Sequence, residues 1–147
     1  MGTRSAIAVA HGNNIKAIYC HWDGYLSHNG VILQKYYNSA KANNLVALGN
    51  ISSLGTDIGE AHDLDRLDIM CKYDEDGFRS DTNFYGRDRG ELNCEFNTFN
   101  STTEFVSTME SVYGCEYFYL MCNGEWSVSF GEEFTLLSQE LVLESMN

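Results

Sequence analysis

Proline is absent from this chain of 147 residues, and neither lysine nor arginine occurs after residue 89. Without proline, Gly, Asn and Asp must form the turns, and a rigid proline-rich linker is excluded. Residues 1–89 hold all nine basic side chains and eleven acidic ones, whereas residues 90–147 hold ten glutamates and no other charged side chain. The net charge of −12 repels phosphate and anionic lipid, which argues against direct binding to nucleic acid or to a membrane surface.

Cysteine is sparse and scattered. The five cysteines never form a C-x-x-C pair, so the sequence predicts neither a disulfide framework nor a zinc knuckle, and we expect small core residues in a reducing cytosol. No apolar stretch approaches the roughly 20 residues of a membrane span, and residues 1–5 lack the apolar segment of a secretory leader. These features predict a soluble cytoplasmic protein without a metal or another cofactor.

The N-terminal half shows strand, helix and loop patterns in turn. Apolar residues alternate on both sides of residues 11–14, which predicts a hairpin over residues 4–22. A helix capped by Ser27 or Asn29 should follow, then a second helix over residues 40–48 that ends at Gly49. Residues 51–66 are rich in Ser, Gly and Asp and predict an irregular loop. Residues 68–73 and 78–85 predict a second hairpin.

The C-terminal part carries the sharpest local patterns. Ser101 or Thr102 should cap a short helix that ends at Gly114. The dipeptide Asn123-Gly124 predicts a hairpin between strands at residues 116–122 and 125–130, and residues 132–146 predict a closing helix. Hairpins mixed with short helices indicate a single α+β domain over residues 1–147, with short helices packed on a largely antiparallel sheet.

The densest cluster of polar and aromatic residues is Y-C-H-W-D-G-Y at residues 19–25. If the strand continues through it, His21 and Asp23 share one face, with His28 close behind, and such a set can serve acid–base or metal chemistry. Trp22 and Tyr25 can instead stack on a ligand, or belong to the core and its rim. The sequence leaves these alternatives open.

Arg87 and Arg89 lie on a segment flanked by glycines, G-R-D-R-G at residues 86–90. Guanidinium groups suit phosphate or carboxylate, and nearby glycines let backbone N–H groups approach an anion. Together with Arg4 they are the candidate cations for an anionic ligand, although both can pair with neighbouring acids instead. The chain has no Walker loop, G-x-G-x-x-G, G-x-S-x-G or H-E-x-x-H motif, so no catalytic residue is predicted.

Three segments taken together resemble a known group of proteins: T-R-S-x-I at residues 3–7, Y-C-H-W-D-G-Y at 19–25 and Y-G-R-D-R-G-E at 85–91. They are similar to a family of small, mostly uncharacterised proteins encoded by bacteriophages and related mobile elements. The resemblance implies an accessory protein that acts in the cytoplasm of an infected bacterium, where such proteins counter host defence or redirect host machinery. It carries over no catalytic residue.

Our first hypothesis is therefore a non-enzymatic binding protein that counters host defence. One mode sequesters a small nucleotide signal, with the ligand-binding residues Arg4, His21, Trp22, Asp23, Tyr25, Arg87 and Arg89. The other mode inhibits a basic host protein through an acidic interface made by Glu125, Glu132, Glu133, Glu140 and Glu144.

Two alternatives belong to other classes of protein. The first is a small hydrolase or lyase that acts on a nucleotide through His21, Asp23 and His28, and the second is a minor structural protein of the phage particle. The sequence does not fix the oligomeric state, so a homo-oligomer stays open.

Overall fold

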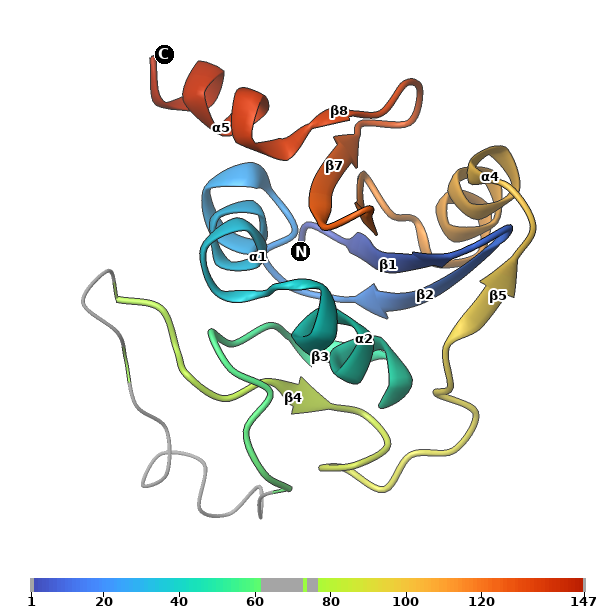
Figure 1. Cartoon of the computed structure of the whole chain (residues 1–147). Helices are drawn as coiled ribbons and strands as arrows, with labels where there is room; N and C mark the ends of the chain where they lie inside the picture. Colours follow the sequence, from blue (N-terminus) through green and yellow to red (C-terminus); the bar gives the residue numbers. More distant parts are fainter. Residues whose placement is uncertain (1, 62–72, 74–76, 147) are drawn as a thin grey trace.

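The computed structural model describes residues 2–61, 73 and 77–146, and it is an α+β domain (Figure 1). Its strands are β1 (Ser5–His11), β2 (Asn14–Cys20), β3 (Ile51–Ser53), β4 (Asn83–Phe84), β5 (Asn97–Phe99), β6 (Tyr117–Cys122), β7 (Glu125–Ser129) and β8 (Thr135–Leu136). Its helices are the π-helix η1 (Leu26–Gly30), α1 (Val31–Tyr36), α2 (Ser39–Ala47), α4 (Thr102–Tyr113) and α5 (Leu137–Ser145).

The described strands form one sheet in the order β4-β3-β2-β1-β6-β7-β8, and β5 also pairs with β2. Five of the pairings are antiparallel, whereas β1 runs parallel to β6 and β2 meets β3 in parallel through Cys20 and Ile51. The sheet is thus largely antiparallel, as the sequence predicts. Its centre joins the start of the chain to β6, more than a hundred residues away.

Each face of the sheet is covered by helices. Alternation along β1 sends Ile7 and Val9 into one core, which η1, α1, α2 and α5 complete, while Ala6 and Ala8 lie in a second core under α4. In Figure 1, α1 lies on the left of the sheet and α4 on the right. Small alanines on the α4 face leave room for the rings of Phe105 and Phe118, which meet edge to face at 6.0 Å.

Both hairpins with clear turn residues are confirmed. His11 pairs with Asn14 across a two-residue turn in which Gly12 has a φ of 58°. Asn123 and Gly124 both take positive φ, 53° and 80°, as a primed turn between β6 and β7 requires.

Other boundaries differ from the prediction. The first helix begins at Leu26 behind Tyr25 without a side-chain cap, so Ser27 and Asn29 lie inside η1 and cap nothing. The predicted loop over 51–66 begins with the strand β3, because Ile51 pairs with β2 and β4. Most of the strand predicted over 68–73 lies outside the described residues, although Tyr73 forms an antiparallel bridge with Arg79. The closing helix starts at Leu137, after β8.

Four described cysteines carry free thiols, and of these Cys20 and Cys115 are buried. In the part of the chain that the structure describes, no helix has the length and apolarity needed to cross a bilayer.

Helix α4 has the cap residues that the sequence predicts. The Ser101 side chain accepts a hydrogen bond from the backbone N–H of Glu104 at 3.1 Å, and Gly114 ends the helix with a φ of 72°. We expect Ser101→Ala to lower the free energy of unfolding by about 1 kcal/mol, because the N–H of Glu104 loses its partner. Urea denaturation measures this, and Ser111→Ala, at an exposed position inside the same helix, should change stability by less than about 0.5 kcal/mol. Equal effects of the two substitutions would contradict the capping role.

Candidate functional site

The chain turns sharply after β2, and the buried side chain of Asn29 holds this turn in place. The Asn29 amide nitrogen lies 3.3 Å from Ser5 Oγ, 3.4 Å from Cys20 Sγ and 3.4 Å from the carbonyl oxygen of Trp22. The backbone N–H of Asn29 donates to the carbonyl of Asp23, which has a φ of 58°. A non-glycine residue with positive φ and a π-helix in one short segment are features that gather at functional sites.

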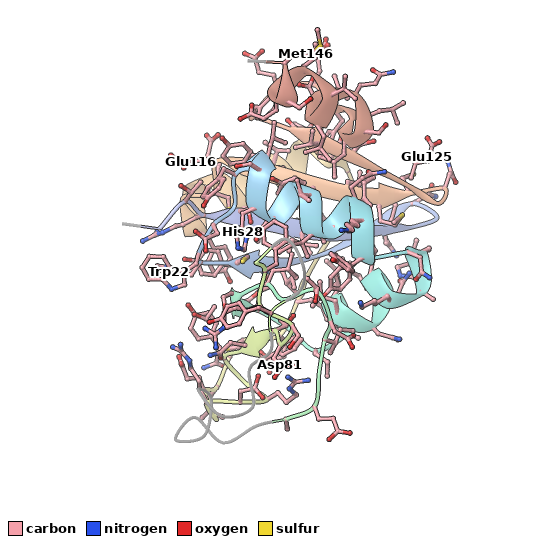
Figure 2. All side chains as sticks on the ribbon, turned by 90° about the vertical axis from the view of Figure 1, so that its left-hand side faces the viewer. Trp22, His28, Asp81, Glu116, Glu125 and Met146 are labelled. Atoms are coloured by element: carbon pink, nitrogen blue, oxygen red, sulfur yellow. The ribbon has the colours of Figure 1, made fainter. Side chains whose placement is uncertain are left out.

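On one side of this turn lies a cleft of about 370 Å³, which we call the arginine–aromatic cleft. Its lining residues are Gly2, Arg4, His21, Trp22, Gly114 and Glu116. Figure 2 shows Trp22 and Glu116 at the same end of the sheet. The Trp22 side chain is 43% exposed, and its ring meets that of His21 edge to face with centroids 4.7 Å apart. The volume falls within the range of small-molecule sites.

Arg4 lies just before β1 and connects the cleft to α4. One guanidinium nitrogen of Arg4 donates to the carbonyl of Tyr113 at 3.0 Å, at the C-terminal end of α4, where a cation interacts favourably with the helix dipole. The residue is otherwise exposed, and a guanidinium has five N–H donors. Arg4 is therefore fixed in position while most of its donors face solvent.

Tyr19 contacts the His21 ring, and Tyr113 in turn packs on Tyr19. The Tyr19 hydroxyl lies 2.5 Å from His21 Nδ1, and the Tyr19 ring stacks on Tyr113 with centroids 4.8 Å apart. The backbone N–H of Tyr19 donates to the side chain of Asn50. With Nδ1 engaged by Tyr19, the second ring nitrogen of His21 is the atom left for a ligand.

Arg89 belongs to another segment and contacts Tyr85 and Ser52. Its guanidinium lies 5.2 Å from the centre of the Tyr85 ring and 3.3 Å from Ser52 Oγ in β3. The charges of both Arg4 and Arg89 act on His21. Two exposed arginines far apart in the sequence thus influence one histidine, and of the two Arg4 lines the cleft.

The titratable groups at this position are held uncharged. Burial, followed by the positive charges of Arg4, of the N-terminal amino group and of Arg89, lowers the pKa of His21 below its ordinary value. Burial raises the pKa of Tyr19 to about 12, against the opposing charge of Arg4, and it also raises the pKa of Tyr85. At neutral pH the site therefore combines two permanent cations with a neutral imidazole and two intact phenols, an arrangement suited to an anion with a hydrogen-bonding aromatic part.

Arg87 has a structural role, unlike Arg89. Its Nε lies 3.0 Å from the carboxylate of Asp88, whose side chain is fully buried. Its terminal nitrogens donate to the backbone carbonyls of Gly59, Ile58 and Thr82 at 2.8–3.2 Å. Its guanidinium also lies 4.4 Å from the Phe84 ring centre. Of the two alternatives open for Arg87 in the sequence, pairing with a local acid is the one the structure displays.

Asp23, Tyr25 and His28 form a separate cluster on the other side of the turn. The Tyr25 hydroxyl donates to Asp23 Oδ1 at 3.3 Å, and His28 Nε2 lies 3.8 Å from Asp23 Oδ2. His28 Nδ1 contacts the Asn29 side chain at 3.0 Å. The expectation that His21 and Asp23 share a strand face is wrong, because β2 ends at Cys20 and Asp23 adopts positive φ.

The candidate interface glutamates do not form one surface. Glu132, Glu133 and Glu140 line a cavity of about 310 Å³ near the start of α5, and Glu144 lies further along that helix. Glu125 is the first residue of β7, and Figure 2 shows it at the end of the sheet opposite Trp22.

The sequence interpretation missed several residues of the site. Tyr19 and Tyr85 are the first residues of two quoted motifs, but no pattern in the sequence indicates that Tyr19 contacts His21 and that Tyr85 contacts Arg89. Glu116 and Tyr113 stand near the C-terminal end of α4 and carry no local pattern. Among the residues that the structure describes, no group of three or more His, Cys, Asp or Glu side chains is arranged to hold a metal ion.

Comparison of the chain with protein-family models, with curated proteins and with solved structures finds no match.

The low pKa of His21 has a measurable consequence. We expect its NMR titration midpoint to lie below 6.5, and Arg4→Gln or Arg89→Gln should raise it because each removes a positive charge. Since the folded-state pKa is the lower one, the contribution of His21 to stability is present above pH 6.5 and is lost as the pH falls through the folded pKa. His21→Gln assigns the resonance, and His11→Gln, at the far end of the hairpin, is the control. A midpoint unmoved by both arginine substitutions would show that neither acts on His21.

The two neighbouring arginines should differ in their effect on stability. We expect Arg87→Ala to lower the free energy of unfolding by about 3 kcal/mol, because it removes a guanidinium that pairs with the buried Asp88 carboxylate and donates to three backbone carbonyls. Arg89→Ala removes an exposed guanidinium and should cost less than about 1 kcal/mol. Chemical denaturation of both variants measures this difference, and a larger loss for Arg89→Ala would contradict the assigned roles.

Proposed function

We propose that this protein is a phage-type accessory protein that counters host defence by sequestering a small nucleotide signal in the arginine–aromatic cleft. The observation that carries the proposal is the cleft in which exposed Arg4 and Trp22 lie with His21, together with the positive charge of Arg89, which also acts on His21, in a molecule with a net charge of −12. In so acidic a protein, an arginine that lines the cleft and a second one whose charge acts on its histidine favour a phosphate there.

Each side chain suits one part of such a ligand. The Trp22 indole can stack on a base, and Arg4 and Arg89 can donate to phosphate oxygens. Neutral His21 adds a hydrogen-bond donor or acceptor, and the Glu116 carboxylate at the rim accepts from hydroxyl or amino groups. Binding without chemistry is the favoured activity, because His21 contacts Tyr19 whereas Asp23 contacts His28, and the three proposed hydrolase residues do not converge.

Tryptophan fluorescence tests this function. Trp22 is 43% exposed and Trp126 only 4%, so stacking of a base should quench Trp22 alone. We expect saturable quenching by a ribonucleoside monophosphate or a cyclic dinucleotide, lost in Trp22→Phe, and an affinity about tenfold lower in Arg4→Gln and in Arg89→Gln. Lys16→Gln, on the middle of β2, is the matched control and should bind normally.

Two outcomes would contradict the proposal. One is the absence of saturable binding across mono-, di- and cyclic nucleotides, and the other is binding that neither arginine substitution weakens. Chromatography of the recovered nucleotide separates sequestration from the hydrolase alternative, since a sequestering protein returns the nucleotide intact.

A further inference from the structure

Helix α5 carries an apolar outer face in addition to its buried one. Leu137 is buried and Leu141 packs against the core, whereas Val142, Leu143 and Met146 are 59%, 56% and 76% exposed. Helical periodicity places these three on the side of α5 turned away from Leu137. Figure 2 shows Met146 at the outer end of the molecule, away from the sheet. A helix with apolar residues on both faces is typically covered on both.

A cavity beside the start of α5 extends this face. The lining residues are Phe130, Glu132, Glu133, Thr135 and Glu140. Thr135 donates to the carboxylate of Glu140 at 3.2 Å, and the half-exposed Phe130 ring meets Tyr117 edge to face at 5.6 Å. Glu144, whose charge acts on Tyr117, lies close to this group. The apolar face thus adjoins a cavity that combines one aromatic ring with three carboxylates.

The charge of this region indicates which occupant it accepts. Residues 90–147 contribute ten glutamates and no cation, so α5 and the segment before it carry only negative charge, although Lys35 of α1 lines a cavity with Leu136 and Ser138. A second copy of the chain would bring another net charge of −12 against it, and like charges at an interface oppose association. A cationic partner with an apolar face can cover the exposed side chains of Val142, Leu143 and Met146, and its positive charges can pair with the carboxylates.

We propose that the outer face of α5 docks a basic amphipathic segment of a partner protein. The partner's apolar side chains would cover Val142, Leu143 and Met146. A lysine or arginine would enter the cavity, where its aliphatic stem lies on Phe130 and its charge meets Glu132, Glu133 and Glu140. This surface is distinct from the arginine–aromatic cleft, so the proposal stands independently of nucleotide binding.

A fluorescently labelled helical peptide serves as the probe. It has about 18 residues, with leucine along one face and arginine along the other. We expect it to bind the full chain in an anisotropy titration. The double substitution Leu143→Ser with Met146→Ser should weaken binding about tenfold. Glu132→Gln with Glu133→Gln should weaken it and flatten its salt dependence.

Two controls separate docking from general attraction to an acidic protein. Val112→Ser alters an exposed apolar residue on α4 instead, and a peptide with glutamine in place of leucine keeps the cationic charge. Equal binding of both peptides, or equal weakening by Val112→Ser, would overturn the proposal. Sedimentation that shows a dimer dissociated by Leu143→Ser would also overturn it, because the occupant would then be a second copy. These substitutions should leave the nucleotide titration unchanged, so the two proposals can fail separately.

Discussion

The hydrogen bonds of one buried amide, that of Asn29, fix the turn on which the candidate site depends. The Asn29 side chain reaches Ser5 on β1, Cys20 on β2 and the carbonyl of Trp22. A buried amide that lost these partners would cost free energy, so the alternatives to this turn are disfavoured. The result is a segment with His21 and Trp22 on one side and Asp23, Tyr25 and His28 on the other.

The order of the strands explains how an acidic protein brings two arginine charges to bear on one histidine. Arg4 precedes β1, Arg89 follows β4, and the charges of both act on His21 just after β2, because β1, β2 and β3 are neighbours in the sheet. Glutamates dominate the C-terminal elements, and four of the five candidate interface glutamates lie in or just before α5. The charge asymmetry of the sequence thus underlies the two surfaces that we propose to be functional, a cleft with Arg4 for a small anion and an acidic, partly apolar face for a basic protein.

Local patterns in the sequence predict the local structure well. Asn123-Gly124 predicts its hairpin, and Ser101 and Gly114 predict the ends of α4, because each acts through hydrogen bonds or φ values within a few residues. The parallel contact of β1 with β6 and the short contact of Cys20 with Ile51 leave no such pattern. Arg87 and Arg89 look equivalent in the sequence. They differ in the structure because Arg87 pairs with the buried carboxylate of Asp88. The sequence therefore identifies candidate site residues, but it does not show which of them lie together in the structure.

The central claim is that Arg4, Trp22 and Arg89 contact one ligand. Two-dimensional NMR of the ¹⁵N-labelled protein, titrated with the nucleotide that quenches Trp22, tests it most directly. We expect the indole N–H resonance of Trp22 and the guanidinium Nε–H resonances of Arg4 and Arg89 to shift together, with a single dissociation constant. Shifts confined to the His28 ring, to the Trp126 indole or to α5, with both arginines unmoved, would contradict it.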